Sequence, residues 1–206
     1  MAETPWDIII FQTNITSSGE GNYNSFKDPL RNMVNEVVAM CEQVHHKKPI
    51  IGWNMFWGYN NPYTIEGVIR SDDINATKEY NAIVSATKEM LADNKDVSLV
   101  IPTGTAVQNV RGTSLHDTTC MQQLTIDGFH MGHGFGRYVV ACTWFQTIIA
   151  PIYGISVEAS SSYLPTSYTN YGNGVTDKVT TENRPILWKC AKAAALHPFE
   201  VTTIDE

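Results

Sequence analysis

Three short apolar runs, each followed by a segment with helical periodicity, constrain the fold of this chain most strongly. The runs are WDIIIF (6–11), PIIGW (49–53) and VSLVIP (97–102). Short, continuous runs rich in β-branched residues are typical of strands buried on both faces of a parallel sheet. Because helical segments alternate with these runs, the order predicts βαβ crossovers and an α/β fold, with a mostly parallel sheet between helix layers.

The helical segments are recognised by apolar residues that recur at spacings of three and four. Asp28 and Pro29 suit the cap and first turn of the earliest helix. The expected helices cover, approximately, residues 29–48, 75–93, 105–111, 134–150 and 181–197. Between them, 54–73 is interpreted as a long aromatic loop and the polar stretch 155–179 as an irregular surface excursion.

Length and charge limit the function classes. The 206 residues suit one domain over 1–206, since no repeat or linker interrupts the pattern. The net charge is −7 and the longest basic run is Lys47-Lys48, which argues against nucleic-acid binding. No apolar run reaches the length of a membrane span. No signal peptide is visible, so the compartment stays open: secreted or periplasmic if an N-terminal segment was removed, cytoplasmic otherwise.

The four cysteines are widely spread and form no CxxC pair. Cys41, Cys142 and Cys190 fall among apolar residues of helical segments. Buried thiols are therefore the expectation, and a structural zinc site is not. No cofactor is indicated.

The first apolar run raises a question of assembly. Only five residues precede Trp6, so strand 6–11 would lie at an open edge of an apolar sheet. Two interpretations follow. A partner covers the strand, either a second copy in a homodimer or a complementing N-terminal chain, or the chain lacks its first βαβ unit.

A D-x-x-H motif, Asp127 and His130, comes just before the helix expected over 134–150. An aspartate beside an imidazole can fix its tautomer and stabilise the imidazolium, which lets the other ring nitrogen accept a proton from a hydroxyl nucleophile. The alternative is a capping aspartate beside a surface histidine. A metal-dependent hydrolase using His130, His133 and Asp127 is a third and weaker alternative, since zinc needs three or four convergent ligands.

Polar side chains also follow the first strand. Gln12, Thr13 and Asn14 would lie at the carboxyl edge of the sheet, where the sites of open α/β folds gather. A side-chain amide there can donate a hydrogen bond to a developing oxyanion, although Asn14 could instead bond its own loop. Trp57, in the aromatic cluster after the second strand, would line a sugar or acyl pocket or pack in the core.

These blocks resemble a known family. DGFH with the following GRYVVACTWF is similar to the last signature block of the SGNH/GDSL hydrolases, and IIIFQTN, GWNMFWGY and VIPTGTAVQNVR are similar to an uncharacterised bacterial branch of that superfamily. The resemblance covers roughly residues 6–150 and implies a flavodoxin-like α/β/α sandwich. It also implies His130 as base, Asp127 as its orienting acid and Asn14 as an oxyanion donor, with Gln12 where many relatives have glycine.

The sequence departs from that family at the nucleophile. The family's serine block precedes the strand that begins here at residue 6, and Ser17-Ser18-Gly19 follows the strand instead. One hypothesis is an esterase or deacetylase that acts on a carbohydrate or another small ester, with a serine supplied by a missing N-terminal segment. The alternative is a degenerate hydrolase fold that binds a ligand or partner through Gln12, Asn14, Trp57 and His130.

Overall fold

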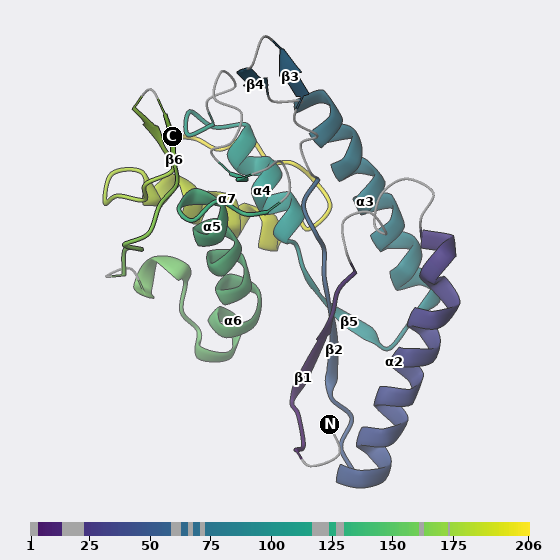
Figure 1. The fold of residues 1–206 in the computed structure, drawn as a ribbon. Helices are drawn as coiled ribbons and strands as arrows, with labels where there is room; N and C mark the ends of the chain where they lie inside the picture. Colours follow the sequence, from purple (N-terminus) through teal and green to yellow (C-terminus); the bar gives the residue numbers. More distant parts are fainter. Residues whose placement is uncertain are drawn as a thin grey trace.

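A parallel three-stranded sheet flanked by helices forms the centre of the molecule (Figure 1). This computed structural model describes residues 4–13, 23–58, 63–65, 68–70, 73–116, 124–126, 130–160, 163–172 and 174–206. The strand order is β1-β2-β5, and all pairs are parallel. The expected α/β fold is therefore confirmed. Within the described residues β1 pairs only with β2, which makes it an edge strand.

The strands match the apolar runs closely. They are β1 (Ile8–Phe11), β2 (Ile50–Asn54) and β5 (Val97–Ile101). Helix α2 (Tyr23–His45) connects β1 to β2, and α3 (Asp73–Asp93) connects β2 to β5. Both helices pack on one face of the sheet in a shared hydrophobic cluster, as expected when successive crossovers of one hand move in the same direction across a sheet.

Helix α2 begins six residues before the expected start, so Pro29 lies inside the helix. The missed signal is Phe26, which extends the apolar stripe by one turn and packs against the cluster formed with α3 and the sheet. Lys27 adds an ion pair to Asp93 at 2.7 Å. Asp28 does not begin the helix but pairs with Arg31 one turn later, at 2.5 Å.

A second group of helices packs together beyond the sheet. It consists of α4 (Thr103–Arg111), α5 (Phe135–Trp144) and α7 (Arg184–Leu196), which share a second hydrophobic cluster. The segment expected as one helix over 134–150 changes pitch: α5 passes into a π-helical turn, η1 (Phe145–Ile149), and then into α6 (Ala150–Tyr153). Gly154 ends α6 in the left-handed conformation, with φ of 64°, where glycine carries no steric penalty.

Each hydrophobic cluster contains buried thiols, as expected from the sequence. Cys41 lies in the cluster of α2, α3 and the sheet, whereas Cys142 and Cys190 lie in the cluster of α4, α5 and α7. Burial raises the pKa of Cys142 and that of Cys190 to about 12. Cys120 lies outside the described residues.

Two small antiparallel hairpins interrupt segments that the sequence pattern presents as loops. The hairpin β3 (Tyr63–Ile65) and β4 (Val68–Arg70) lies within the aromatic stretch 54–73. The hairpin β6 (Asn170–Gly172) and β7 (Val175–Thr176) lies within 155–179. The period-2 signal is too short in both places to stand out from a loop.

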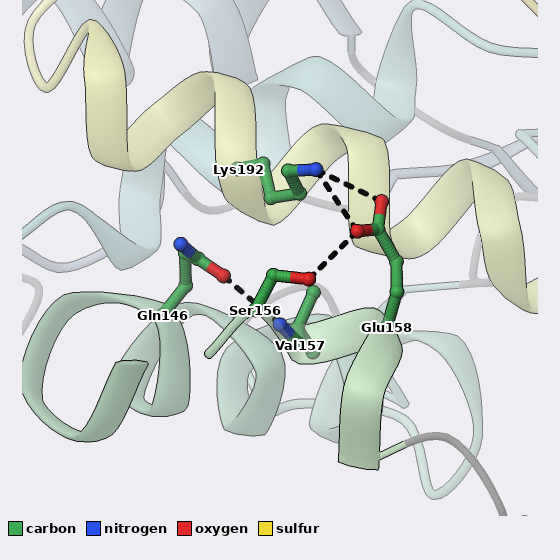
Figure 2. A network of polar contacts seen from close by, with 5 residues as sticks. All are labelled: Gln146, Ser156, Val157, Glu158 and Lys192. Carbon is green, nitrogen blue, oxygen red and sulfur yellow. Dashed lines mark hydrogen bonds and ion pairs between the residues drawn. The ribbon is translucent and has the colours of Figure 1, made fainter. Parts of the chain in front are cut away.

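Contacts between polar groups connect the stretch after α6 to α7 (Figure 2). The side chain of Gln146, in the π-helical turn, accepts a hydrogen bond from the backbone N–H of Val157 at 3.1 Å. Val157 begins the short 3-10 helix η2 (Val157–Ser160). Glu158 accepts hydrogen bonds from Ser156 at 2.7 Å and from Lys192 on α7 at 2.9 Å. These contacts join η1, η2 and the more distant helix α7.

Ion pairs connect the amino ends of the strands. Lys47 pairs with Asp7 just before β1, and Lys48 pairs with Asp96 just before β5. The single basic run of the sequence is therefore neutralised by neighbouring carboxylates at this edge of the sheet. No helix of the described ranges has the length and apolar character that a bilayer span requires.

Candidate functional site at the carboxyl edge of the sheet

Three polar side chains meet where the parallel strands end. Gln12 follows β1, Asn54 is the last residue of β2, and Thr103 comes two residues after the end of β5. The carboxyl ends of parallel strands share one edge of a sheet, so residues far apart in sequence come together there. Gln12 is exposed, whereas Asn54 is 4% exposed and Thr103 is fully buried.

A chain of hydrogen bonds joins these side chains. The Thr103 hydroxyl donates to Oδ1 of Asn54 at 2.7 Å. The Asn54 amide nitrogen, Nδ2, donates to Oε1 of Gln12 at 3.0 Å. The buried Thr103 and Asn54 side chains thus hydrogen-bond to each other, and Asn54 also hydrogen-bonds to Gln12 at the surface. Buried polar groups generally require such partners. Gln12 is the exposed end of this chain.

The connection between β5 and α4 places Thr103 beside Asn54. Only Pro102 separates the strand from the helix. The backbone N–H of Gly104 donates to the carbonyl of Met55 at 2.8 Å, which satisfies one of the free N–H groups at the start of α4. A side chain at position 104 would overlap the Phe56 carbonyl. The close approach of the two backbones therefore requires glycine.

Trp57 extends from this edge toward the second helical group. Its ring is half-buried and packs against the cluster of α4, α5 and α7. The neighbouring Phe56 ring lies 4.7 Å away, tilted by 50°. Met131, next to His130, belongs to the same cluster. The segment after β2 thus connects the carboxyl edge to the region of the D-x-x-H motif. Trp53 is buried in the other cluster, as expected.

His130 lies at the end of a tightly paired turn. Thr125 and Met131 form an antiparallel bridge, and the backbone N–H of Gly132 donates to the Leu124 carbonyl at 2.8 Å. The N–H of Ile126 donates to the carbonyl of His130, also at 2.8 Å. Positions 126 and 130 are therefore adjacent, and the His130 side chain is exposed. Asp127 lies outside the described residues.

The buried carboxylate of Asp177 contacts the glycine-rich turn that follows His130, residues 132–136. Asp177 is fully buried at the end of the 155–179 stretch, and its Oδ2 accepts the Gly134 N–H at 2.9 Å and the Tyr171 hydroxyl at 3.3 Å. Its Oδ1 accepts the Thr169 N–H, and its backbone carbonyl accepts the Phe135 N–H at 3.0 Å. Asp177 thus satisfies the first N–H groups of α5, where negative charge is favourable.

Close backbone approaches explain Gly132, Gly134 and Gly136, which follow His130. A side chain at Gly132 would overlap the Asp177 carboxylate and the Tyr171 hydroxyl, and one at Gly134 would overlap the Asp177 backbone. A side chain at Gly136 would overlap the Leu124 carbonyl. The end of the 155–179 stretch therefore requires glycine at 132 and 134, and the Leu124 backbone requires it at 136. Asp177 and Val179 at that end are buried, whereas most described residues of the stretch are exposed or partly exposed.

The structure places the sequence-predicted residues in two regions. Gln12 and Trp57 belong to the carboxyl edge, and His130 belongs to the paired turn. Asn14 and Asp127 lie outside the described residues, so their roles stay predictions. In the described part of the chain no group of three or more His, Cys, Asp or Glu side chains could hold a metal ion.

Sequence reasoning missed Asn54, Thr103 and Asp177. A signal existed for the first two, because each is a polar residue directly at or after the end of an apolar run, as are Gln12 and Asn14. Asp177 gives no comparable signal. Its contact with Gly134 spans 43 residues, and nothing in the local pattern around 177 indicates burial.

Comparison with known proteins supports a family assignment. A search of the curated proteins finds no significant match. Among solved structures, a crystal structure of a DUF4886 family protein from Bacteroides uniformis matches with a TM-score of 0.68 and 26% sequence identity, over 98% of this chain and 67% of that chain. The family model for DUF4886, a domain of unknown function, matches residues 1–173. The chain therefore belongs to the DUF4886 family.

Proposed function

We propose that this chain binds a small ester, such as an acylated carbohydrate, at the carboxyl edge of its sheet and contributes the acid–base group of an SGNH-like ester hydrolase. The observation that carries the proposal is the hydrogen-bonded chain from Thr103 through Asn54 to Gln12, which holds an exposed amide at the edge where ligands of open α/β sheets bind. The resemblance of the DGFH block to that superfamily supports His130 as the base.

The chemistry follows from these roles. A serine hydroxyl attacks the ester carbonyl carbon and gives its proton to His130, while Gln12 and Asn14 donate hydrogen bonds to the oxyanion. The ester C–O bond then breaks, and the departing alcohol takes the proton from His130. Water repeats the sequence on the acyl intermediate and releases the acid. Asp127 orients the imidazole and stays ionised. In this scheme the serine comes from a separate segment, because the family's serine block precedes the strand that corresponds to β1.

Hydrolysis of p-nitrophenyl acetate tests the proposal, with intact mass measured on the same sample. If that mass includes a segment carrying the serine, we expect turnover above the buffer rate and a loss of at least about 100-fold in His130→Ala. His133→Ala is the matched control, since it removes an imidazole from the same turn. Equal rates for wild type and His130→Ala would overturn hydrolysis by this chain. Equal losses in both variants would point to a metal-dependent site instead.

A second candidate is a ligand-binding module without catalysis. The observation in its favour is that the Thr103–Asn54–Gln12 chain is complete without a nucleophile. Isothermal titration with an acetylated monosaccharide distinguishes the candidates. Binding that Gln12→Leu abolishes and His130→Ala leaves unchanged, together with no turnover, would support the binding module and contradict the hydrolase.

A further inference from the structure

The buried pair Asn54 and Thr103 determines which end of the Gln12 amide faces the surface. A glutamine amide has an acceptor end and a donor end, and it can present either one. In this structure Oε1 of Gln12 is occupied by the Asn54 Nδ2 donor at 3.0 Å. The Nε2 group of an exposed Gln12 is thereby turned away from Asn54, with two N–H donors.

The Thr103 hydroxyl fixes this direction through Asn54. Thr103 is fully buried, so its hydroxyl proton needs an acceptor. In the described part of the chain that acceptor is Oδ1 of Asn54, at 2.7 Å. If Asn54 were turned over, its amide nitrogen would face the hydroxyl and the buried proton would lose that acceptor. The hydroxyl therefore sets Asn54, and Asn54 sets Gln12.

We propose that Asn54 and Thr103 are positioning residues that present Gln12 as a hydrogen-bond donor, so that this edge accepts ligands carrying a carbonyl or carboxylate oxygen at that point. The inference specifies which group of a ligand Gln12 contacts. It rests on the proposed function only where it predicts an effect on catalysis. The polarity itself follows from the three side chains and holds whether or not the ligand is hydrolysed.

Asn54→Asp reverses the polarity with a change of one group. The Thr103 hydroxyl still donates to one carboxylate oxygen, but the other oxygen now faces Gln12 and accepts from it. The Gln12 amide must then turn over and present Oε1 outward. Gln12→Glu is the matched surface variant, since it also presents only acceptors and leaves the buried pair intact. Because residue 12 is exposed, this variant tests the same idea even if Asn54→Asp folds poorly.

Side-chain amide spectra of ¹⁵N-labelled protein measure the orientation directly. In wild type we expect the Gln12 Nε2 protons to exchange rapidly with water, and in Asn54→Asp to exchange at least about tenfold more slowly. Thr103→Val should broaden or split the Gln12 signal, and Thr103→Ser should restore it. Slow exchange at Gln12 in wild type, or equal exchange in wild type and Asn54→Asp, would overturn the proposal.

Titration with sodium acetate tests the ligand class. We expect acetate to shift the Gln12 Nε2 resonance in wild type and to leave it unchanged in Asn54→Asp, with Gln12→Glu binding acetate at least about tenfold more weakly. If the enzyme turns over esters, Asn54→Asp should lower kcat by at least about tenfold and change KM by less than about threefold. An acetate shift without turnover would remove only the proposed hydrolysis. Turnover with no response at Gln12 would remove only this inference.

Discussion

The carboxyl edge of the sheet and the glycine-rich turn that follows His130 are held in place by different kinds of contact. At the carboxyl edge, Gln12, Asn54 and Thr103 come from the ends of strands that are already paired, so the fold of the sheet positions them. At the turn, His130 is followed by a backbone that depends on Asp177 from a distant, irregular stretch. One region is built on regular structure, and the other on a single buried carboxylate.

The comparison teaches where the molecule is sensitive to substitution. Loss of one side chain at the carboxyl edge leaves β1, β2 and β5 in place, because their backbone hydrogen bonds do not involve it. Loss of the Asp177 side chain removes the acceptor of two backbone N–H groups and of the Tyr171 hydroxyl at once. We therefore expect the removal of a polar side chain to act mainly on stability at the turn and mainly on binding at the edge.

The largest expected effect is that of Asp177→Ala. The change leaves the N–H groups of Gly134 and Thr169 and the Tyr171 hydroxyl without their acceptor. Since an unsatisfied buried polar group costs about 1–3 kcal/mol, we expect the free energy of unfolding to fall by about 3–4 kcal/mol. Urea denaturation measures it. Asp28→Ala is the control, because that carboxylate is exposed, and a loss below about 1 kcal/mol at Asp177 would contradict the comparison.

Glycine substitutions test both regions with the same chemical change. Gly104→Ala at the edge and Gly134→Ala at the turn each place a methyl group against a backbone carbonyl, so each should lower the free energy of unfolding by about 2–3 kcal/mol. Gly112→Ala is the control, since its nearest atom would be 3.4 Å away, an ordinary contact. Thermal denaturation compares the three. If Gly134→Ala unfolds at the wild-type temperature, the turn is not as closely packed as described.

The smallest effect is expected at the exposed beginning of the same 155–179 stretch. The pKa of Glu158 is lowered by the hydrogen bond from Lys192 and then by that from Ser156, relative to the ordinary value of 4.5. A lowered folded-state pKa contributes stability above the ordinary pKa and loses it as the pH falls through the folded value. Glu158→Gln should therefore cost less than about 1 kcal/mol at neutral pH. The melting temperatures of the two proteins should converge as the pH falls below the lowered pKa of Glu158, and a difference that does not depend on pH would refute the ion pair as its cause.

Most of the sheet could be predicted from the sequence. The three apolar runs match the strands to within one or two residues, because continuous β-branched segments have few alternatives to a buried strand. The helices lie in the segments with helical periodicity, and the predictions fail where a single aromatic residue or a change of pitch decides a boundary. Phe26 extends α2, and the π-helical turn divides the helix expected over 134–150.

The candidate site could be predicted only in part. The position of Gln12 at the carboxyl edge follows from the strand that precedes it. The same rule, applied to the end of the second strand, identifies Asn54 as the partner of Gln12. The environment of His130 could not be predicted, because it depends on contacts between the turn and residues 169–177. Such contacts are set by tertiary packing, and neither periodicity nor composition encodes them locally.

The distribution of thiols gives each half of the molecule an internal reporter. Cys41 is enclosed by α2, α3 and the sheet, whereas Cys142 and Cys190 are enclosed by α4, α5 and α7. A thiol with a pKa of about 12 is almost wholly protonated at neutral pH, so Cys142 and Cys190 become reactive toward alkylating reagents only when their surroundings open. Which of Cys41, Cys142 and Cys190 is alkylated first under mild denaturation would therefore identify the half that opens first.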